Sequence, residues 1–444
     1  MQERGGSVKL NPFKWSEIML LEFQVSNFRS IKDPLTLSMQ AKESSKLNTF
    51  SHNAYHLLRS AVIYGANASG KSNLLKAMAF MKAMVLNQHK VIQTTDSLPH
   101  EPFRLSTETE NASSQFEMTF LVGDTKYRYG FDADNSHVYS EWLYAAKTQR
   151  EARLFYRDAD DENYVNPRLY KEGMAFYDAD KKRIKIPSNQ LLLWRCDQND
   201  GEVSKLVLTW FSSLNLLDGL RSEGYAGYAL SQLKNPEFKS KMLRLLNSAD
   251  IQIGDIKLKE STLSSDDIAQ MPIPEPLKEW MVREGRMASM DVKTTHVKLN
   301  EENQPVGKVQ FSLEQDESVG TNKFFHISAP ILNTLQEGKV LLIDELDASL
   351  HPMLTAHLVR LFNDPALNQN NAQLIFATHD TNLLRPEMFR RDQIWLTEKS
   401  SNASTVAFSL SQFKDIRKQE AFERQYLFGK YGGVPYLSKF ELSV

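Results

Sequence analysis

Eight residues near the start of the chain have the types and spacing of a phosphate-binding loop. Gly65-Ala-Asn-Ala-Ser-Gly-Lys-Ser72 fits the pattern G-x-x-x-x-G-K-[ST], between a short apolar run and a segment with helical periodicity. Glycines let such a loop curl so that successive backbone N–H groups face phosphate oxygens, and the following helix adds partial positive charge at its N-terminus. The residues expected to bind ATP are Gly65, Ala66, Asn67, Ala68, Ser69, Gly70, Lys71, Ser72 and Asn73.

A second motif supplies carboxylates that suit this loop. The apolar run Val340–Ile343 predicts a buried strand, and Asp344 and Glu345 follow it directly. Lys71 is expected to reach the β- and γ-phosphates, while Ser72 and Asp344 hold Mg²⁺. Glu345 is placed to orient or deprotonate the attacking water. The two motifs together predict an ATPase, with Lys71 and Glu345 among its catalytic residues.

Two further clusters stand at the ends of predicted elements. A buried strand over Leu374–Ala377 runs into Thr378-His379-Asp380, and His379 is a candidate catalytic contact to the γ-phosphate. Glu317-Ser318-Val319-Gly320-Thr321 directly precedes a helical segment. A small, hydroxyl-bearing segment at a helix N-terminus can bind an anion, or it can simply cap the helix.

The surrounding periodicities predict the elements that position these residues. Met19–Phe28 alternates apolar and polar residues as a half-buried strand does, and Gly123-Asp124 marks the turn of a hairpin over 116–131. Helical patterns dominate 202–247. The remaining expected strands are 61–64, 137–145, 153–157, 340–343, 373–377, 393–397 and 405–409. The remaining expected helices are 72–86, 322–335 and the segment that contains Leu354, Leu358 and Leu361.

The composition is that of an ordinary globular protein. The 444 residues are 41% hydrophobic and 24% charged with a formal net charge of −2, so bulk charge does not favour a nucleic-acid coat. The single cysteine, Cys196, excludes a disulfide framework. No apolar run reaches the ~18 residues of a membrane span, and no signal-peptide core is present. We therefore expect a cytoplasmic protein without a membrane partner.

The order of the motifs resembles that of the ABC-type ATPase heads of the SMC, RecF and OLD group. GANASGKSN is similar to their phosphate-binding loop, ESVGT stands where they carry an LSGG-type signature, LLIDELDASLHP matches Walker B with the D-loop, and ATHD matches the switch histidine. FQVSNFRSIKD resembles the N-F-(R/K)-S opening of these heads. Over nearly residues 20 to 437, the chain also resembles the AbiL/RloA-type ATPases, which are predicted bacterial ATPases of abortive-infection and restriction-linked operons.

The resemblance implies a site completed by a second copy of the chain. In such heads two copies stack head to tail, and Ser318 and the Gly320 amide would bind the γ-phosphate on the partner copy. Asp347 of the D-loop would couple the two sites. Arg29 would approach the nucleotide from the N-terminal strand, although a simple surface role for it is equally compatible with the sequence. A homodimer or a higher homo-oligomer is therefore expected.

Three departures from the family pattern stand out. Ala68 replaces a glycine of the usual phosphate-binding loop, and Val319 interrupts a signature that is otherwise small and polar. The glutamine of a Q-loop has only Gln115 as a candidate. None of the three prevents nucleotide binding.

The expected fold class is α/β: an ABC-type ATPase head with an N-terminal antiparallel β part and a mostly helical insertion. The expected domains are a disordered extension (1–18), the N-terminal head part with the phosphate-binding loop (19–135), an inserted β/helical arm region (136–306), and the C-terminal head part with signature, Walker B and switch histidine (307–444).

The function that this reading favours is a nucleotide-driven sensor or switch in bacterial anti-phage defence. About 65 residues follow His379, which leaves no room for a nuclease in the same chain, so we expect a separately encoded effector or toxin. Its docking surface is expected within about 136–300, where tryptophans could anchor it, although core packing is the commoner fate of that residue. These tryptophans are Trp142, Trp194, Trp210 and Trp280.

Two alternatives compete with this reading. A stand-alone P-loop kinase or GTPase would leave the histidine strand and the signature unexplained, and no N-K-x-D-type motif for base recognition is present. A RecF-like DNA-repair ATPase would share the chemistry but would bind DNA. The candidate DNA contact is a run of basic residues, although such a run is more often a solvated surface than a binding site. The run consists of Lys181, Lys182, Arg183 and Lys185.

Overall fold

The computed structural model describes residues 18–42, 45–148, 150–221, 223–262, 274–275, 278, 288–414, 416 and 420–435. The expected N-terminal extension lies outside these residues except for Ile18, and so does Trp280. The chain divides into two compact units. The first comprises Met1–Gly219, Thr334–Ala348 and Thr355–Val444, and the second comprises Leu220–Asn333 and Ser349–Leu354.

A six-stranded sheet forms the centre of the first unit. Five parallel strands and one antiparallel edge strand follow the order β13-β17-β18-β5-β19-β20. Because both faces of its central strands are covered, those strands are almost uniformly apolar, as in the buried SAVIYG and QLIFA runs. The strands are β13 (Leu214–Asp218), β17 (Val340–Asp344), β18 (Gln373–Ala377), β5 (Ser60–Gly65), β19 (Ile394–Lys399) and β20 (Thr405–Ser409).

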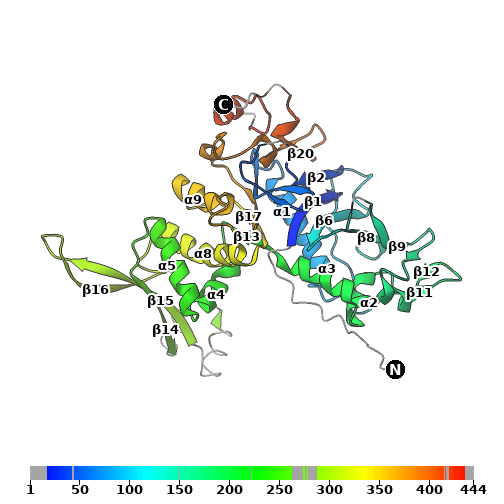
Figure 1. Cartoon of the computed structure of the whole chain (residues 1–444), viewed down its shortest axis with the longest axis horizontal. Helices are drawn as coiled ribbons and strands as arrows, with labels where there is room; N and C mark the ends of the chain where they lie inside the picture. Colours follow the sequence, from blue (N-terminus) through cyan, green and yellow to red (C-terminus); the bar gives the residue numbers. More distant parts are fainter. Residues whose placement is uncertain are drawn as a thin grey trace, which may run out of the picture. The chain divides into compact units, whose positions relative to one another are not determined.

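The predicted helix after the phosphate-binding loop is confirmed as α1 (Lys71–Val85). It packs against strands β13, β17, β18 and β5, and Figure 1 shows it beside β13 and β17. Its buried apolar side chains recur at helical spacing, among them Leu74, Met78 and Met81. The helix therefore holds the loop at its N-terminus against the ends of the central strands.

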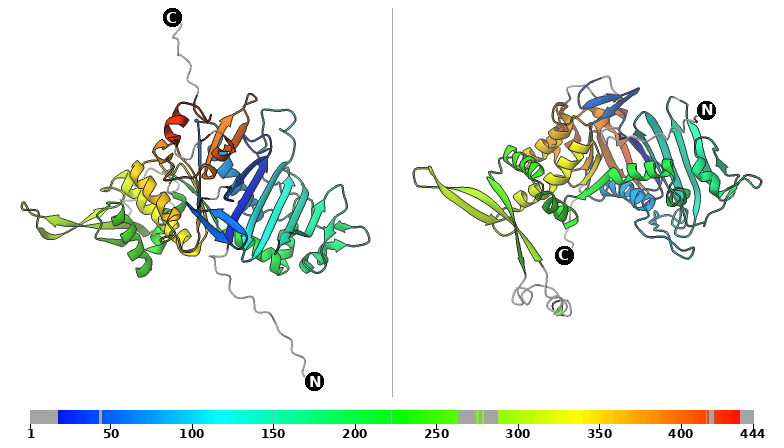
Figure 2. Two further views of the ribbon diagram at one scale, coloured as in Figure 1. Left: turned by 45° about the horizontal axis from the view of Figure 1, so that its top comes forward. Right: turned by 60° about the horizontal axis from the view of Figure 1, so that its bottom comes forward.

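An antiparallel sheet of seven strands forms the second layer of the first unit, in the order β10-β9-β8-β7-β6-β1-β2. Figure 2 shows its strands side by side. The predicted hairpin is confirmed, with Gly123 in a left-handed conformation at the turn. The strands are β1 (Ile18–Ser26), β2 (Leu35–Ser38), β6 (Ser114–Val122), β7 (Thr125–Ala133), β8 (Val138–Ala146), β9 (Ala152–Asp158) and β10 (Tyr164–Val165).

Short elements complete the first unit. Two are hairpins, β3 (Thr49–His52) with β4 (Tyr55–Leu58) and β11 (Tyr177–Asp178) with β12 (Arg183–Ile184). The helices are α2 (Leu192–Gln198), α3 (Glu202–Ser213), α9 (Pro352–Asn363) and α10 (Phe422–Leu427). The 3-10 turns are η2 (Lys171–Phe176), η3 (Thr381–Leu383), η4 (Arg391–Gln393) and η5 (Leu410–Gln412). Helix α9 begins in the second unit.

The second unit combines helices with a small antiparallel sheet. Its helices include α4 (Glu223–Gln232), α5 (Pro236–Ser248) and α8 (Val319–Glu337), the last of which ends in the first unit. Its sheet has the order β14-β15-β16, with β14 (Asp255–Thr262), β15 (Ala288–Leu299) and β16 (Pro305–Ser312). The hairpin β15–β16 was not expected from the sequence.

The structure differs from the sequence analysis in two places, the start of the inserted unit and the helical region 202–247. Strands β8 and β9 continue the antiparallel sheet, so the first unit runs to Gly219 and the inserted unit begins near 220 rather than 136. The helical pattern over 202–247 is interrupted by β13, which pairs in parallel with β17 from Leu214↔Val340 to Asp218↔Asp344. Pairing with a distant strand overrides the local helical periodicity there.

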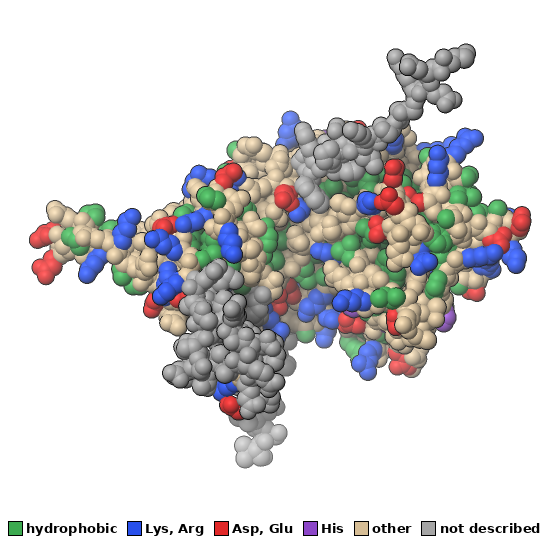
Figure 3. Space-filling view, turned by 90° about the horizontal axis from the view of Figure 1, so that it is seen from below, with side chains coloured by type: hydrophobic (Ala, Val, Ile, Leu, Met, Phe, Trp, Pro, Cys, Tyr) green, Lys and Arg blue, Asp and Glu red, His purple; other side chains and the backbone are tan. Residues whose placement is uncertain are grey.

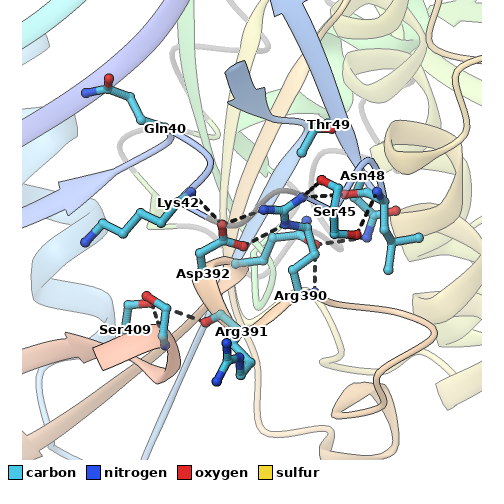
Figure 4. A network of polar contacts seen from close by, with 12 residues as sticks. Gln40, Lys42, Ser45, Asn48, Thr49, Arg390, Arg391, Asp392 and Ser409 are labelled. Atoms are coloured by element: carbon cyan, nitrogen blue, oxygen red, sulfur yellow. Dashed lines mark hydrogen bonds and ion pairs between the residues drawn. The ribbon is translucent and has the colours of Figure 1, made fainter. Parts of the chain in front are cut away.

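A buried ion pair joins distant segments of the first unit. Arg390 donates two hydrogen bonds of 2.8 Å to the Asp392 carboxylate, and the two side chains are 1% and 2% exposed (Figure 4). Asp392 also accepts a hydrogen bond from the backbone N–H of Lys42, and Arg390 donates to the carbonyl of Ser45. The pair therefore attaches Lys42 and Ser45 to the turn that precedes β19.

Replacement of Asp392 tests this attachment. Asp392→Ala removes the acceptor of two hydrogen bonds from Arg390 and one from the Lys42 N–H, so the free energy of unfolding should fall by about 2–3 kcal/mol. Urea unfolding measures the change. Asp33→Ala, which removes an exposed carboxylate, is the control and should change stability by less than about 0.5 kcal/mol. A loss below about 1 kcal/mol in Asp392→Ala would show that Lys42 and Ser45 are held by other contacts.

Candidate active site

Three neighbouring strands bring the sequence motifs to one edge of the central sheet. Strand β18 lies between β5 and β17, and all three are parallel, so their carboxyl ends meet at the same edge. The phosphate-binding loop follows β5, Asp344 ends β17, and Thr378 follows β18. Parallel pairing therefore assembles residues that are more than 270 positions apart in the chain.

A cavity of about 1210 Å³ opens at this edge, and all of its lining residues belong to the first unit. Asn67–Asn73 of the phosphate-binding loop, Glu345 and His379 lie on its wall. Arg29 and the loop His100–Leu105 line it as well. The cavity thus brings together the predicted phosphate-binding, water-activating and γ-phosphate-sensing side chains.

Lys71 is held at the mouth of the phosphate-binding loop. Its ammonium donates hydrogen bonds to the carbonyls of Gly65 at 2.8 Å and Ala66 at 3.2 Å, and the residue is 6% exposed. Burial lowers the pKa of Lys71, while the carboxylates of Asp344, Glu345 and Asp347 act to raise it. The loop thus has a charged donor in place for a phosphate group.

Ser72 and Asp344 lie together as a pair of oxygen ligands. The Ser72 hydroxyl donates to the Asp344 carboxylate at 3.0 Å. Burial raises the pKa of Asp344 and the opposed Asp218 adds to this effect, whereas the Ser72 hydrogen bond and Lys76 lower it. Hard oxygen donors held this close fit Mg²⁺, which binds through one or two protein oxygens together with substrate phosphates.

Two threonines from the far end of the chain pack against the loop glycines. A Cβ on Gly65 would overlap the side chain of Thr397, and one on Gly70 would overlap that of Thr405. The Thr397 hydroxyl contacts Ser69 Oγ at 2.7 Å, and the Thr405 hydroxyl donates to the Ser69 carbonyl at 2.9 Å. Sequence reasoning missed these threonines, because nothing local marks a strand residue as a neighbour of the loop.

Ala68 has the backbone conformation that a glycine would adopt more easily. Its φ is +60°, in the left-handed region, which costs a non-glycine residue roughly 1 kcal/mol. The loop keeps this curvature even though its family pattern has glycine at this place. The departure noted in the sequence therefore affects the stability of the loop rather than its shape.

Glu345 follows Asp344 with a left-handed backbone at φ +53°. Gly219, at the end of β13, donates its N–H to the Asp344 carbonyl at 2.7 Å, and a Cβ on Gly219 would overlap the backbone of Asp344 and Glu345. Only a residue without a side chain fits this close approach. Gly219 is a further residue that the sequence analysis missed. The only local sign of its role is that it follows an apolar run that ends in an aspartate, Asp218.

Asp347 is tied to the end of β18 within the same chain. Its carboxylate accepts from the Thr378 hydroxyl at 2.7 Å and from the His379 N–H at 3.3 Å. The expected D-loop residue thus orients the segment that carries His379, whose exposed side chain lines the cavity.

The N-terminal strand contributes one wall of the cavity. Arg29 pairs with Glu101 at 2.5 Å, with side chains 36% and 43% exposed, and its N–H donates to the Glu101 carbonyl. Buried Asn27 donates to the carbonyls of Thr109 and Ala112 and accepts from the Phe103 N–H. The N-F-R-S segment therefore shapes loop 100–112, and Asn27 is a further organising residue that sequence analysis did not single out.

The signature segment lies in the second unit. Ser318 is exposed, and its hydroxyl accepts from the Thr321 N–H at 3.1 Å, so it caps α8. Val319 is 72% exposed. Gln115 lies exposed on β6 and is not a lining residue of the cavity, so the structure does not bring this Q-loop candidate to the site.

The basic run proposed for DNA is engaged in local bonds. Lys182 pairs with Glu162 at 2.9 Å and Lys185 with Asp178 at 2.7 Å, while Arg183 donates to backbone carbonyls of 158–161. On the face drawn in Figure 3, Lys and Arg side chains are interspersed with Asp and Glu side chains. Two of the four cations in this run, Lys182 and Lys185, are therefore paired with carboxylates.

The expected tryptophan anchors are core residues where the structure describes them. Trp142, Trp194 and Trp210 are 7%, 5% and 1% exposed. Trp210 stacks on Phe120 with ring centroids 4.2 Å apart. These three side chains are therefore not available to a partner.

Comparisons with known proteins place this site in context. The family model described as "AAA domain, putative AbiEii toxin, Type IV TA system" matches residues 60–385, more than half of the chain. No curated protein matches the sequence. No helix among the described residues is long and apolar enough to cross a membrane.

Among solved structures, three SMC heads are similar. The SMC head bound to the C-terminal winged-helix domain of ScpA is 14% identical, with 90% of this chain and 97% of that chain covered and a TM-score of 0.40. The SMC head domain from Thermotoga maritima is 13% identical, with 88% and 98% covered and a TM-score of 0.38. An SMC head with an extended coiled coil, bound to the C-terminal domain of ScpA from Pyrococcus furiosus, is 13% identical, with 89% and 97% covered and a TM-score of 0.36.

Gly219→Ala tests whether close backbone packing positions Glu345. The added methyl group displaces the Asp344–Glu345 backbone but leaves the phosphate-binding loop intact. ATP hydrolysis should fall about tenfold or more, while ATP affinity stays within about twofold of wild type. Steady-state hydrolysis and equilibrium nucleotide binding measure the two effects. The control is Gly227→Ala, because a Cβ there meets nothing within 4 Å. Unchanged hydrolysis in Gly219→Ala would contradict the positioning role.

Proposed function

The chain belongs to the AAA domain family whose model matches residues 60–385. From this premise, we propose that it is a P-loop ATPase of the ABC and SMC type and that it hydrolyses ATP at a site completed by a second copy of the chain. The observation that carries the proposal is the cavity on which Lys71, Ser72, Glu345 and His379 meet.

Each of these residues has a role that its placement supports. Lys71 binds the β- and γ-phosphates together with the loop N–H groups, and Ser72 and Asp344 hold Mg²⁺. Bound Mg²⁺ would offset negative charge on the phosphate oxygens. Glu345, half-buried on the cavity wall, accepts the proton of the attacking water. His379 contacts the γ-phosphate, and Asp347 keeps it in position through the backbone.

The exposed signature is what a second copy would supply. Ser318 and the Gly320 N–H stand at the N-terminus of α8, a helix of 19 residues whose dipole favours an anion. We propose that they bind the γ-phosphate held by the partner copy. ATP then joins two heads through contacts that ADP cannot make, and hydrolysis releases them.

We propose that this cycle serves as a switch in bacterial anti-phage defence and controls a separately encoded effector or toxin. The proposal is supported by the resemblance to AbiL/RloA-type ATPases and by the matched family, described as "AAA domain, putative AbiEii toxin, Type IV TA system". A RecF-like role on DNA has less support, because the basic run at 181–185 is paired with acidic and carbonyl groups.

Glu345→Gln tests the catalytic assignment. The amide keeps the shape of the side chain but cannot accept the proton, so hydrolysis should slow by about 100-fold or more. ATP binding should persist, and the ATP-bound chain should accumulate as a dimer in size-exclusion chromatography with light scattering. The matched control is Glu314→Gln, an exposed carboxylate outside the cavity. Wild-type turnover in Glu345→Gln would refute the assignment.

The role in defence is tested by phage challenge of bacteria that carry the chain with its neighbouring gene. Protection should require both proteins and should be lost with Lys71→Ala, because that variant lacks the charged donor for the β- and γ-phosphates. Plaque counts measure protection, and copurification with mass spectrometry identifies the partner. Full protection by this chain alone would contradict control of a separate effector. ATP-dependent retention of duplex DNA would instead support the repair function.

A further inference from the structure

A carboxylate directly before the signature serine is bonded to the hairpin β15–β16. One Glu317 carboxylate oxygen accepts from the Thr294 hydroxyl at 2.6 Å and from His296 Nε2 at 2.7 Å. The Glu317 and His296 side chains are 12% and 23% exposed, and Thr294 is fully buried. All three residues belong to the second unit, so the contact lies within one compact body.

The surroundings fix this contact on both sides. The His296 ring packs on Phe311 of β16, with centroids 5.0 Å apart. Asn322 of α8 donates to the carbonyls of Leu313 and Ser318, and Asp316 accepts from the Ser312 N–H at 2.6 Å. The segment between β16 and α8 therefore has a defined path. It is attached to β15 at two points, by the Leu313 N–H that donates to the Val292 carbonyl at 2.9 Å and by Glu317.

Capping of the helix does not account for Glu317. The Ser318 side chain already caps α8 through the Thr321 N–H, so the bonds of Glu317 serve another purpose. A carboxylate next to a phosphate-binding position would also repel the phosphate unless its charge is directed away and offset. Thr294 and His296 draw the Glu317 carboxylate toward β15 and satisfy it there.

We infer that Glu317 is a positioning residue for ATP hydrolysis, which sets the direction of the signature Ser318 through its bonds to Thr294 and His296. The inference rests on the proposed function, because Ser318 matters for hydrolysis only if it meets ATP on a second copy. It assigns the β15–β16 hairpin a specific task, namely to hold the signature segment in its binding orientation.

The test compares Glu317→Ala with Glu317→Gln. The alanine removes the acceptor, whereas the glutamine keeps a side-chain oxygen for the same two donors. For Glu317→Ala, kcat should fall roughly tenfold or more, while the ATP affinity of the separate chain stays unchanged. The lost acceptor lowers the thermal unfolding midpoint, so kcat is measured at a temperature at which each variant is folded. Glu317→Gln should restore at least half of the wild-type kcat. His296→Ala should lower kcat as well, and the double variant should be no worse than Glu317→Ala alone.

Two reference variants separate the possible failures. Glu314→Ala removes an exposed carboxylate of the same segment and should hydrolyse ATP like wild type. Ser318→Arg blocks the signature itself and should abolish both hydrolysis and ATP-dependent dimerisation. If Ser318→Arg keeps the wild-type rate, the composite site proposed above is wrong. If Ser318→Arg is inactive but folded Glu317→Ala and His296→Ala both keep the wild-type kcat, the positioning role alone is overturned.

Discussion

Parallel pairing of β5, β18 and β17 is the constraint on which the candidate site depends. All three strands end at the same edge of the sheet. There β5 leads into the phosphate-binding loop, β17 ends at Asp344 just before Glu345, and β18 leads into the segment that carries His379. The apolar character of these strands keeps them in the middle of the sheet, since both of their faces are covered. A register shift of one residue would separate Ser72 from Asp344 and Thr378 from Asp347.

Buried polar groups keep the two sheets of the first unit in register with each other. Gln373 of β18 accepts from the Leu20 N–H at 2.7 Å and donates to the Leu20 carbonyl at 3.1 Å, so it joins the central sheet to β1. Thr405 and Ser30 make a similar contact at 2.7 Å beside the phosphate-binding loop. Because such groups are costly to bury without partners, they select one arrangement of the layers.

The two units divide the chemistry between them. In the proposed function, the first unit carries the residues that would hold and hydrolyse the nucleotide, and the second carries the signature segment with its own hydrogen-bonded support. In the proposed cycle, ATP has an effect because one copy binds it through both its own cavity and the partner's signature. The energy of the switch is then the difference between contacts made with ATP and those made with ADP.

Local patterns were sufficient for the motifs and for most elements of the first unit. The loop spacing at 65–72, the apolar run before Asp344 and the periodicity of α1 are properties of neighbouring residues, and the structure agrees with each. Contacts between distant segments decided the rest: β13 became a strand because β17 pairs with it, and Thr397, Thr405 and Gly219 reached the site through the sheet. The hairpin β15–β16 and the bonds of Glu317 likewise depend on packing between segments, which no local spacing encodes.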